Sequence, residues 1–124
     1  MVQEKVLEKI DSERLKAFVV WTPRFPGDSR AQALSSMKLV SDKRALHFWD
    51  GSGWLGKHFG KALKLPANTT FAWDVYFVYD AQAKWDKTPP VPSEWMHQLG
   101  GTGERMLDAD KLREIVRSRL RDAK

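Results

Sequence analysis

Three short apolar segments, separated by patterns typical of helices, most constrain the fold of this 124-residue chain. The segments are Leu15 to Trp21 (LKAFVVW), Ala45 to Trp49 (ALHFW) and Thr70 to Tyr79 (TFAWDVYFVY). Their length and their content of β-branched and aromatic residues favour buried strands over helices. Strands that alternate with helices are typical of an α/β layer in which some neighbouring strands run parallel. We therefore predict an α/β fold.

Between and beyond these segments, apolar residues recur at helical spacing. The pattern predicts helices over 2–14, from Asp28 or Ser29 to about Val40, over 54–63, and from Asp108 to near the C-terminus. The side chains expected to face inward are Val2, Val6, Leu7 and Ile10, then Ala33, Leu34, Met37 and Val40, then Trp54, Leu55, Phe59 and Leu63, and finally Leu112, Ile115, Val116 and Leu120. Each helix thus has one apolar face to pack on a sheet.

The third strand segment is expected to begin a hairpin. Residues 80–83 have turn character, so the chain is predicted to return through Lys84-Trp85. The prolines at 89, 90 and 92 exclude regular structure there, and the glycine-rich residues 100–103 predict a flexible link. The resulting order is helix, strand, helix, strand, short helix, hairpin, helix. At this length we predict one domain over 1–124.

The chain contains no cysteine. Disulfides, thiolate metal sites, iron–sulfur clusters and cysteine nucleophiles are therefore excluded for these residues. No apolar run reaches the length that a membrane span requires. The first residues are charged and lack the apolar core of a signal peptide. We expect a soluble product that stays in the cytoplasm as the sequence is written, without a membrane partner.

A net charge of +5 permits binding to nucleic acid but does not require it. Many of the basic residues lie on the predicted C-terminal helix, where Glu104, Asp108, Asp110, Glu114 and Asp122 interleave with them. No exposed aromatic platform accompanies the arginines, as single-stranded nucleic acid would favour. We therefore interpret this helix as a solvated surface and expect no nucleic-acid partner.

Four blocks carry a resemblance to a known family: VVWTPRFPGDSRA, SDKRALHFWDGSGWLGKHF, FAWDVYFVYDAQAKW and PPVPSEWMHQLG. In this order they resemble an uncharacterised bacterial family of thioredoxin-like proteins with a pattern VVWTP, then DxRxxxxWD, then AWDVYxxYD before a tryptophan. The resemblance covers most of Leu15 to Leu99. It implies a thioredoxin-like α/β fold with three layers and a mixed sheet.

The chain departs from that family at its start. The resemblance implies a further strand and a CxxC motif before the first helix, and this sequence begins inside that helix. The implied strand would lie between the strands matching Phe18–Trp21 and Trp73–Tyr79, so its absence leaves two unpaired strand edges. We expect the fold to be N-terminally incomplete. A truncated gene product or misplaced start is the favoured explanation; alternatively, Ala45 to Trp49 fills the vacancy, or a partner chain supplies a strand. Free edges also predict a homodimer.

The resemblance further implies a cis-proline before the strand that faces the CxxC motif. Thr69-Thr70-Phe71 occupies that position here, and Pro66 lies too far upstream. Without the proline and without thiols, oxidoreductase activity would rest on analogy of fold alone.

His47, Asp50, Asp74 and His97 are the candidate metal ligands. No two of them have the close spacing of a typical zinc motif. The competing interpretation is that the two carboxylates accept hydrogen bonds from indole or backbone N–H groups at strand ends. We favour that structural role and expect no metal and no cofactor.

The six tryptophans support two interpretations. They pack as core and half-buried side chains, or several of them line a groove for a small molecule or peptide at the strand ends. The candidate groove consists of Trp21, His47, Trp49, Asp50, Trp73, Asp74, Trp95 and His97.

Two functions remain open from the sequence. The chain is either the inactive fragment or remnant of a protein similar to thiol–disulfide oxidoreductases, or a non-catalytic module that binds a small molecule or a protein. No catalytic residue is predicted for either.

Overall fold

A computed structural model describes residues 1–25, 27–66, 69–99 and 103–122. The predicted link at 100–103 therefore lies mostly outside the described residues. In chain order the elements are η1 (Val2–Val6), η2 (Leu7–Lys9), β1 (Ala17–Trp21), α1 (Arg30–Ser36), η3 (Met37–Val40), β2 (Ala45–Trp49), α2 (Trp54–Ala62), β3 (Val75–Val78), β4 (Glu94–His97) and α3 (Ala109–Asp122). This order confirms the predicted mixture of helices and strands.

β1 and β2 form a parallel pair, in register from Ala17 opposite Ala45 to Trp21 opposite Trp49. Side chains alternate between the two faces of a strand, so the two faces differ in character. On one face Phe18 (64%), Val20 (39%), Leu46 (52%) and Phe48 (51%) are exposed. The opposite face is partly buried along both strands. The apolar sequence of these strands therefore does not lead to burial on both faces.

β3 and β4 form an antiparallel pair, with Tyr76 opposite Met96. Beyond β4, His97 makes an isolated bridge to Met106. The outer side of β4 is therefore partly occupied.

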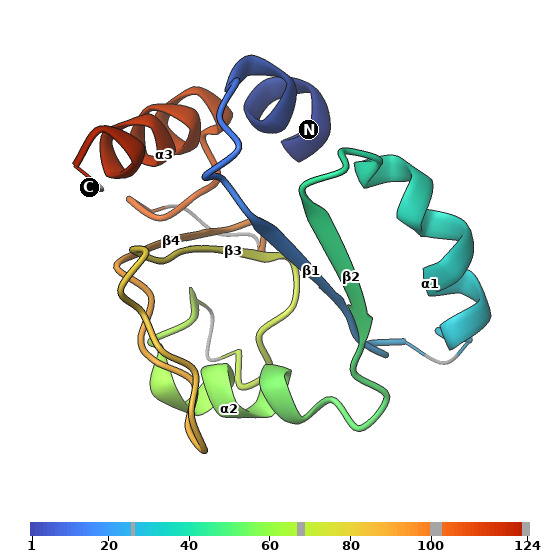
Figure 1. Cartoon of the computed structure of the whole chain (residues 1–124). Helices are drawn as coiled ribbons and strands as arrows, with labels where there is room; N and C mark the ends of the chain where they lie inside the picture. The colour runs from blue at the N-terminus through green and yellow to red at the C-terminus, as the bar shows by residue number, and fades with distance from the viewer. Residues whose placement is uncertain (26, 67–68, 100–102, 123–124) are drawn as a thin grey trace.

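The two pairs do not join into the single mixed sheet expected from the resemblance. Among the residues that the structure describes, β1 and β2 form one two-stranded sheet and β3 and β4 form another. β2 lies on the side of β1 that faces away from the hairpin, so it does not fill the vacancy beside β1 (Figure 1). Within the described residues, neither the free edge of β1 nor the free edge of β3 pairs with a strand.

A buried hydrophobic cluster lies between the N-terminal turns, the hairpin and α3. Its members are Val6, Ile10, Val78, Met96 and Leu112, and the side chains packed around it are Leu15, Tyr76, Leu107, Ile115, Val116 and Leu120. All four side chains predicted to face inward from the last helix are among them. α3 lies beside η1 on one side of the hairpin, as Figure 1 shows.

α2 covers the other side of the hairpin (Figure 1). Phe59 of α2 packs on Phe77 of β3 with ring centroids 4.5 Å apart. Phe77 alternates with Tyr76 and Val78, which pack toward α3. The hairpin is therefore the middle of three local layers.

Glycines allow α2 to approach the segment before β3. The backbone N–H of Ala72 donates to the carbonyl of Gly56 at 2.8 Å. A Cβ at Gly56 would meet the ring of Phe71, and a Cβ at Gly60 would overlap the backbone carbonyl of Thr70. Glycine at these two positions leaves room for the Phe71 ring and for the Thr70 backbone, respectively.

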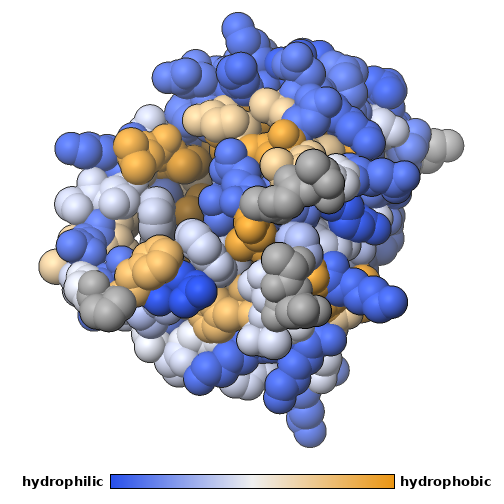
Figure 2. All heavy atoms as spheres, turned by 180° about the vertical axis from the view of Figure 1, so that it is seen from behind, coloured by the Kyte–Doolittle hydropathy of each residue, from blue (hydrophilic) through white to orange (hydrophobic). Residues whose placement is uncertain are grey.

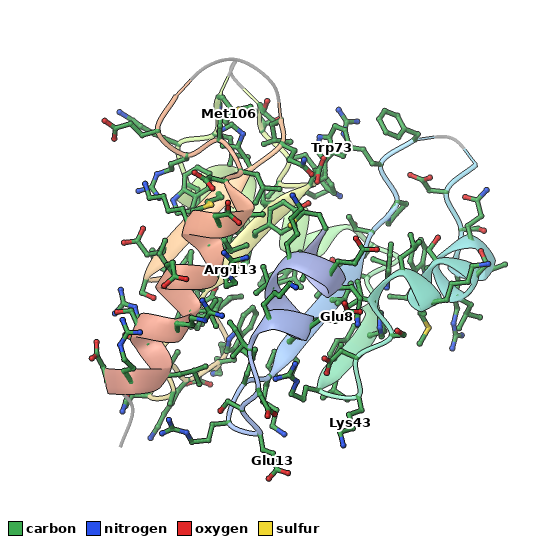
Figure 3. All side chains as sticks on the ribbon, turned by 90° about the horizontal axis from the view of Figure 1, so that it is seen from above. Glu8, Glu13, Lys43, Trp73, Met106 and Arg113 are labelled. Atoms are coloured by element: carbon green, nitrogen blue, oxygen red, sulfur yellow. The ribbon has the colours of Figure 1, made fainter. Side chains whose placement is uncertain are left out.

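The first helix is shorter than predicted, because residues 2–9 form π and 3₁₀ turns and Ile10 is already extended. Two arginines of α3 donate hydrogen bonds to backbone carbonyls of these N-terminal turns. Arg113 donates to the carbonyl of Lys5 at 3.2 Å and Arg117 to that of Lys9 at 2.9 Å. Figure 3 shows Arg113 on the side of α3 that faces η1. These two arginines of α3 thus bind backbone carbonyls of the N-terminal turns as well as reaching solvent.

The predicted return strand at Lys84-Trp85 is also wrong, because β3 pairs with Glu94–His97. Backbone and side-chain hydrogen bonds both hold the long connection between the two strands. The hydroxyl of Tyr79 donates to the carbonyl of Pro90, and the Ser93 hydroxyl donates to that of Val78, both at 2.8 Å. Prolines thus precede the second strand of the hairpin without preventing it.

Three further predictions differ in detail. The third strand spans only Val75–Val78, because Asp74 has a φ of 54° and interrupts an extended backbone. Leu34 and Trp54 are exposed, although their spacing predicted burial.

Figure 2 shows apolar residues reaching one face of the molecule below the hydrophilic region formed by η1 and α3. None of the described helices is long and apolar enough to cross a membrane.

Candidate functional site

Trp21 and His47 lie side by side at the carboxyl ends of β1 and β2. The indole Nε1–H of Trp21 donates to His47 Nδ1 at 3.0 Å, and the rings stack with centroids 6.1 Å apart. His47 Nε2 lies 2.9 Å from the carbonyl of Val40. Because the indole can only donate, Nδ1 accepts and Nε2 donates to Val40. Both nitrogens are used, and His47 has no lone pair left for a metal.

Asp50 follows β2 and organises the start of α2. Its carboxylate accepts from the backbone N–H of Leu55 at 2.9 Å and from the hydroxyl of Ser52 at 3.0 Å. Gly53, at the N-cap, has a φ of 69° and no side chain to cap the helix. The Asp50 carboxylate, three residues before Gly53, caps the helix instead. The dipole of α2 favours a negative charge at this end. The hypothesis that this carboxylate accepts backbone N–H bonds agrees with this arrangement.

A cavity of about 180 Å³ lies between α1 and the ends of β1 and β2. Trp21 and Trp49 line it, together with Thr22, Asp28, Ser29, Gln32, Ala33 and Ser36. Ser29 also caps α1, because its hydroxyl accepts from the backbone N–H of Gln32. Two of the predicted groove residues therefore share one cavity.

Trp73 lies just before β3 and meets the loop that follows β1. Its ring makes an edge contact with Phe25 at 5.3 Å between centroids. The guanidinium of Arg24 lies 5.3 Å from the Trp73 ring and 5.2 Å from the Phe25 ring. Figure 3 labels Trp73 on the side of the molecule where these segments approach. The cation and the two rings form a cation–π cluster.

Asp28 holds the loop that carries Arg24 and Phe25. One of its carboxylate oxygens accepts from the backbone N–H of Phe25 at 2.7 Å and of Arg24 at 2.8 Å. These bonds favour the charged form and lower the pKa of the Asp28 carboxyl. The backbone of the loop is therefore fixed while the Arg24 side chain extends from it.

A larger cavity of about 490 Å³ opens beside this loop. Pro23 and Arg24 line it from the end of β1, and Thr69, Thr70 and Phe71 line it from the segment before β3. Residues distant in sequence thus meet where two strand ends come together.

Asp74 belongs to a separate polar group. The hydroxyl of Tyr76 lies 3.0 Å from the Asp74 carboxylate and 2.8 Å from the side-chain oxygen of Gln98. Burial, followed by the hydrogen bond to Asp74, raises the pKa of Tyr76. Asp74 is therefore engaged with a phenol.

Trp95 and His97 are buried within β4. The Arg105 guanidinium lies 4.5 Å from the Trp95 ring and donates to the backbone carbonyl of Trp95 at 3.2 Å. His97 Nδ1 accepts from the backbone N–H of Leu99 at 3.2 Å. These contacts give both side chains a structural role in the hairpin.

The eight predicted groove residues thus fall into three groups. Trp21, His47, Trp49 and Asp50 lie at the ends of β1 and β2, Trp73 and Asp74 precede β3, and Trp95 and His97 lie in β4. Nowhere in the described part of the chain do three or more His, Asp or Glu side chains gather as a metal site would require. Arg24 and Phe25 were not predicted as site residues from the sequence. They lie in a proline-flanked loop directly after an apolar strand, and this position at a strand end could have indicated them.

Compared with protein-family models, with curated proteins and with solved structures, the chain gives no match.

Proposed function

We propose that this chain is a thioredoxin-like domain without thiols that acts as a non-catalytic protein-binding module. Its partner supplies an extended strand that pairs with β1 and β3. The observation that carries the proposal is that, among the described residues, β1 pairs on one edge only with β2 and β3 on one edge only with β4, so that each has an edge without a strand. The resemblance of the sequence to thioredoxin-like proteins implies a strand in the same place.

Backbone chemistry supports an extended occupant. A free strand edge presents a row of N–H and C=O groups that another strand can satisfy. Here two such edges belong to one molecule, since β2 pairs only with β1 and β4 only with β3 among the named strands. A strand placed between them gains hydrogen bonds on both of its sides, which is the mode of recognition by strand addition.

The neighbouring side chains define the chemistry of the occupant. β1 contributes Phe18, Val19 and Val20, and β3 contributes Val75 and Phe77. A strand between them would have apolar neighbours on both sides, and proline would remove a ladder donor. We therefore propose an apolar, proline-free segment of a partner chain as the occupant.

Amide hydrogen exchange tests this proposal. Short peptides are selected from a displayed library on the immobilised protein, and the tightest peptide is synthesised. We expect it to slow exchange at backbone amides in both β1 and β3. Selection of no peptide, or protection confined to other elements, contradicts the proposal.

The same measurement at increasing protein concentration, without peptide, tests a second copy as the occupant. Protection of β1 and β3 together with a dimer by light scattering would assign the edges to a homodimer. That result would replace the heterologous partner with another copy of this chain.

We propose small-molecule binding as a second candidate function, supported by the cavity that Trp21 and Trp49 share. Open α/β sheets bind ligands at the carboxyl ends of parallel strands, which is where this cavity lies. Titration of tryptophan fluorescence with a metabolite panel tests it. A response lost in Trp49→Phe but kept in Trp85→Phe supports it, and a flat response across the panel contradicts it.

A further inference from the structure

The larger cavity is the remaining feature that neither proposed function uses. It has a volume of about 490 Å³ and is lined by Pro23, Arg24, Thr69, Thr70 and Phe71. Its walls combine one cation, two hydroxyl-bearing side chains and two apolar surfaces. Among the described residues that line it there is no carboxylate, and Arg24 gives them a positive charge.

Arg24 is the cation of this cavity. Among the described residues the ion pairs involve Arg44, Arg113, Arg117 and Arg119, and none involves Arg24. Its guanidinium instead lies against Phe25 and Trp73. An arginine held against aromatic rings keeps its N–H donors directed outward and loses little freedom when it binds an oxyanion.

Each of the two segments that line the cavity is followed by an aspartate, and both carboxylates already have hydrogen-bond partners. Asp28 accepts the backbone N–H groups of Arg24 and Phe25. Asp74, which follows Trp73, lies within hydrogen-bond distance of the Tyr76 hydroxyl. Neither forms an ion pair with Arg24 in the described structure.

We propose that this cavity binds the carboxylate of a small organic acid with an apolar body. Arg24 pairs with the carboxylate, the hydroxyls of Thr69 and Thr70 donate to it, and Pro23 and Phe71 contact the apolar part. The inference is independent of strand binding, because it requires no pairing at β1 or β3.

Benzoate serves as the probe, and benzamide serves as its uncharged counterpart. The indole N–H signals of the six tryptophans are followed by ¹⁵N NMR, and Trp73→Phe identifies the signal of Trp73. We expect benzoate to shift the Trp73 signal in a saturable way and benzamide to have a much weaker effect. The spectra also show whether each variant is folded.

Three variants distinguish a specific site from general electrostatic attraction. We expect Arg24→Gln to weaken benzoate binding about tenfold, since a charge-assisted hydrogen bond is lost. Arg24→Lys should fall between, because an ammonium cannot bind a carboxylate through two parallel bonds. Arg121→Gln removes the same charge from the exposed end of α3 and should leave binding unchanged.

Three outcomes would overturn the inference. Equal weakening by Arg24→Gln and Arg121→Gln would indicate nonspecific attraction by net charge. Equal affinity for benzamide would remove the carboxylate from recognition. Equal effects of inorganic phosphate and benzoate would indicate an adventitious ion only. Failure of any of these tests leaves amide protection at β1 and β3 unaffected, so the two proposals stand or fall separately.

Discussion

Arg44 uses every donor that its side chain possesses. Its guanidinium donates to the carbonyls of Leu7 at 2.6 Å, Ile10 at 2.7 Å and Ser12 at 2.9 Å. The remaining donors reach the Asp42 carboxylate at 2.8 and 2.9 Å. Both side chains are largely buried. One residue directly before β2 thus donates to carbonyls at and just after the end of the N-terminal turns.

Replacing this arginine tests its contribution. We expect Arg44→Ala to lower the free energy of unfolding by about 3 kcal/mol, because a buried carboxylate and three carbonyls lose their partner. Arg44→Lys should recover only part of this, since one ammonium has fewer donors. Urea denaturation measures both. The neighbouring, exposed Lys43→Ala is the control, and an equal loss in that variant would show that Arg44 has no special role.

The same ion pair gives stability a pH dependence. Hydrogen bonds from the Arg44 side chain and backbone lower the pKa of Asp42 from 3.8 to about 2. Because the Asp42 carboxyl has a lower pKa in the folded than in the unfolded protein, its ionised form stabilises the fold at pH values above about 4. This contribution is lost as the pH falls from about 4 to 2. We expect the urea midpoint to fall in that window. Asp42→Asn should reduce the fall, and an unchanged fall would assign it to other carboxylates.

At the scale of elements, α2 shows how packing between backbones restricts the sequence. Gly60 lies against the carbonyl of Thr70, and Gly56 lies against the ring of Phe71. The ring can rotate, whereas the carbonyl belongs to the chain. The cost of a methyl group should therefore differ between the two positions.

We expect Gly60→Ala to destabilise the protein by about 1–3 kcal/mol, despite the higher helix propensity of alanine. Gly56→Ala should cost less, since the Phe71 side chain can move. Thermal unfolding followed by circular dichroism measures both. Lys61→Ala, on an exposed neighbouring position, is expected to have little effect. A neutral Gly60→Ala would mean that α2 is not packed closely on the segment before β3.

Periodicity and capping predicted the elements that depend on local sequence. β2 matches its predicted bounds, β1 lies within its predicted range, and α3 begins after Asp108, whose carboxylate accepts from the N–H of Lys111. β4 was missed because Glu94–His97 depends on a long-range pairing that follows three prolines. In the candidate site, Trp21 and Trp49 line one cavity and the other six predicted groove residues do not line it, whereas the position of Arg24 depends on ring contacts across the chain that no local pattern contains.

At the scale of the whole molecule, the missing thiols determine one expected result. Thiol–disulfide exchange requires attack by a thiolate, and the chain has no cysteine. We expect insulin reduction by dithiothreitol to proceed at the same rate with and without this protein. Acceleration above a bovine serum albumin control would contradict the proposed non-catalytic function.

The division into two sheets also has a consequence for cooperativity. The buried hydrophobic cluster takes Val6 from η1, Ile10 from the residue after η2, and its other members from the hairpin and α3, and β1 and β2 contribute none of its buried members. Units that share little buried surface can open separately. We expect calorimetry to give a total enthalpy larger than the van't Hoff value, which is the signature of unfolding in more than one step. Equal values would show that the sheets unfold as one unit. If the sheets unfold separately, a partner strand that pairs with both β1 and β3 would make their unfolding cooperative.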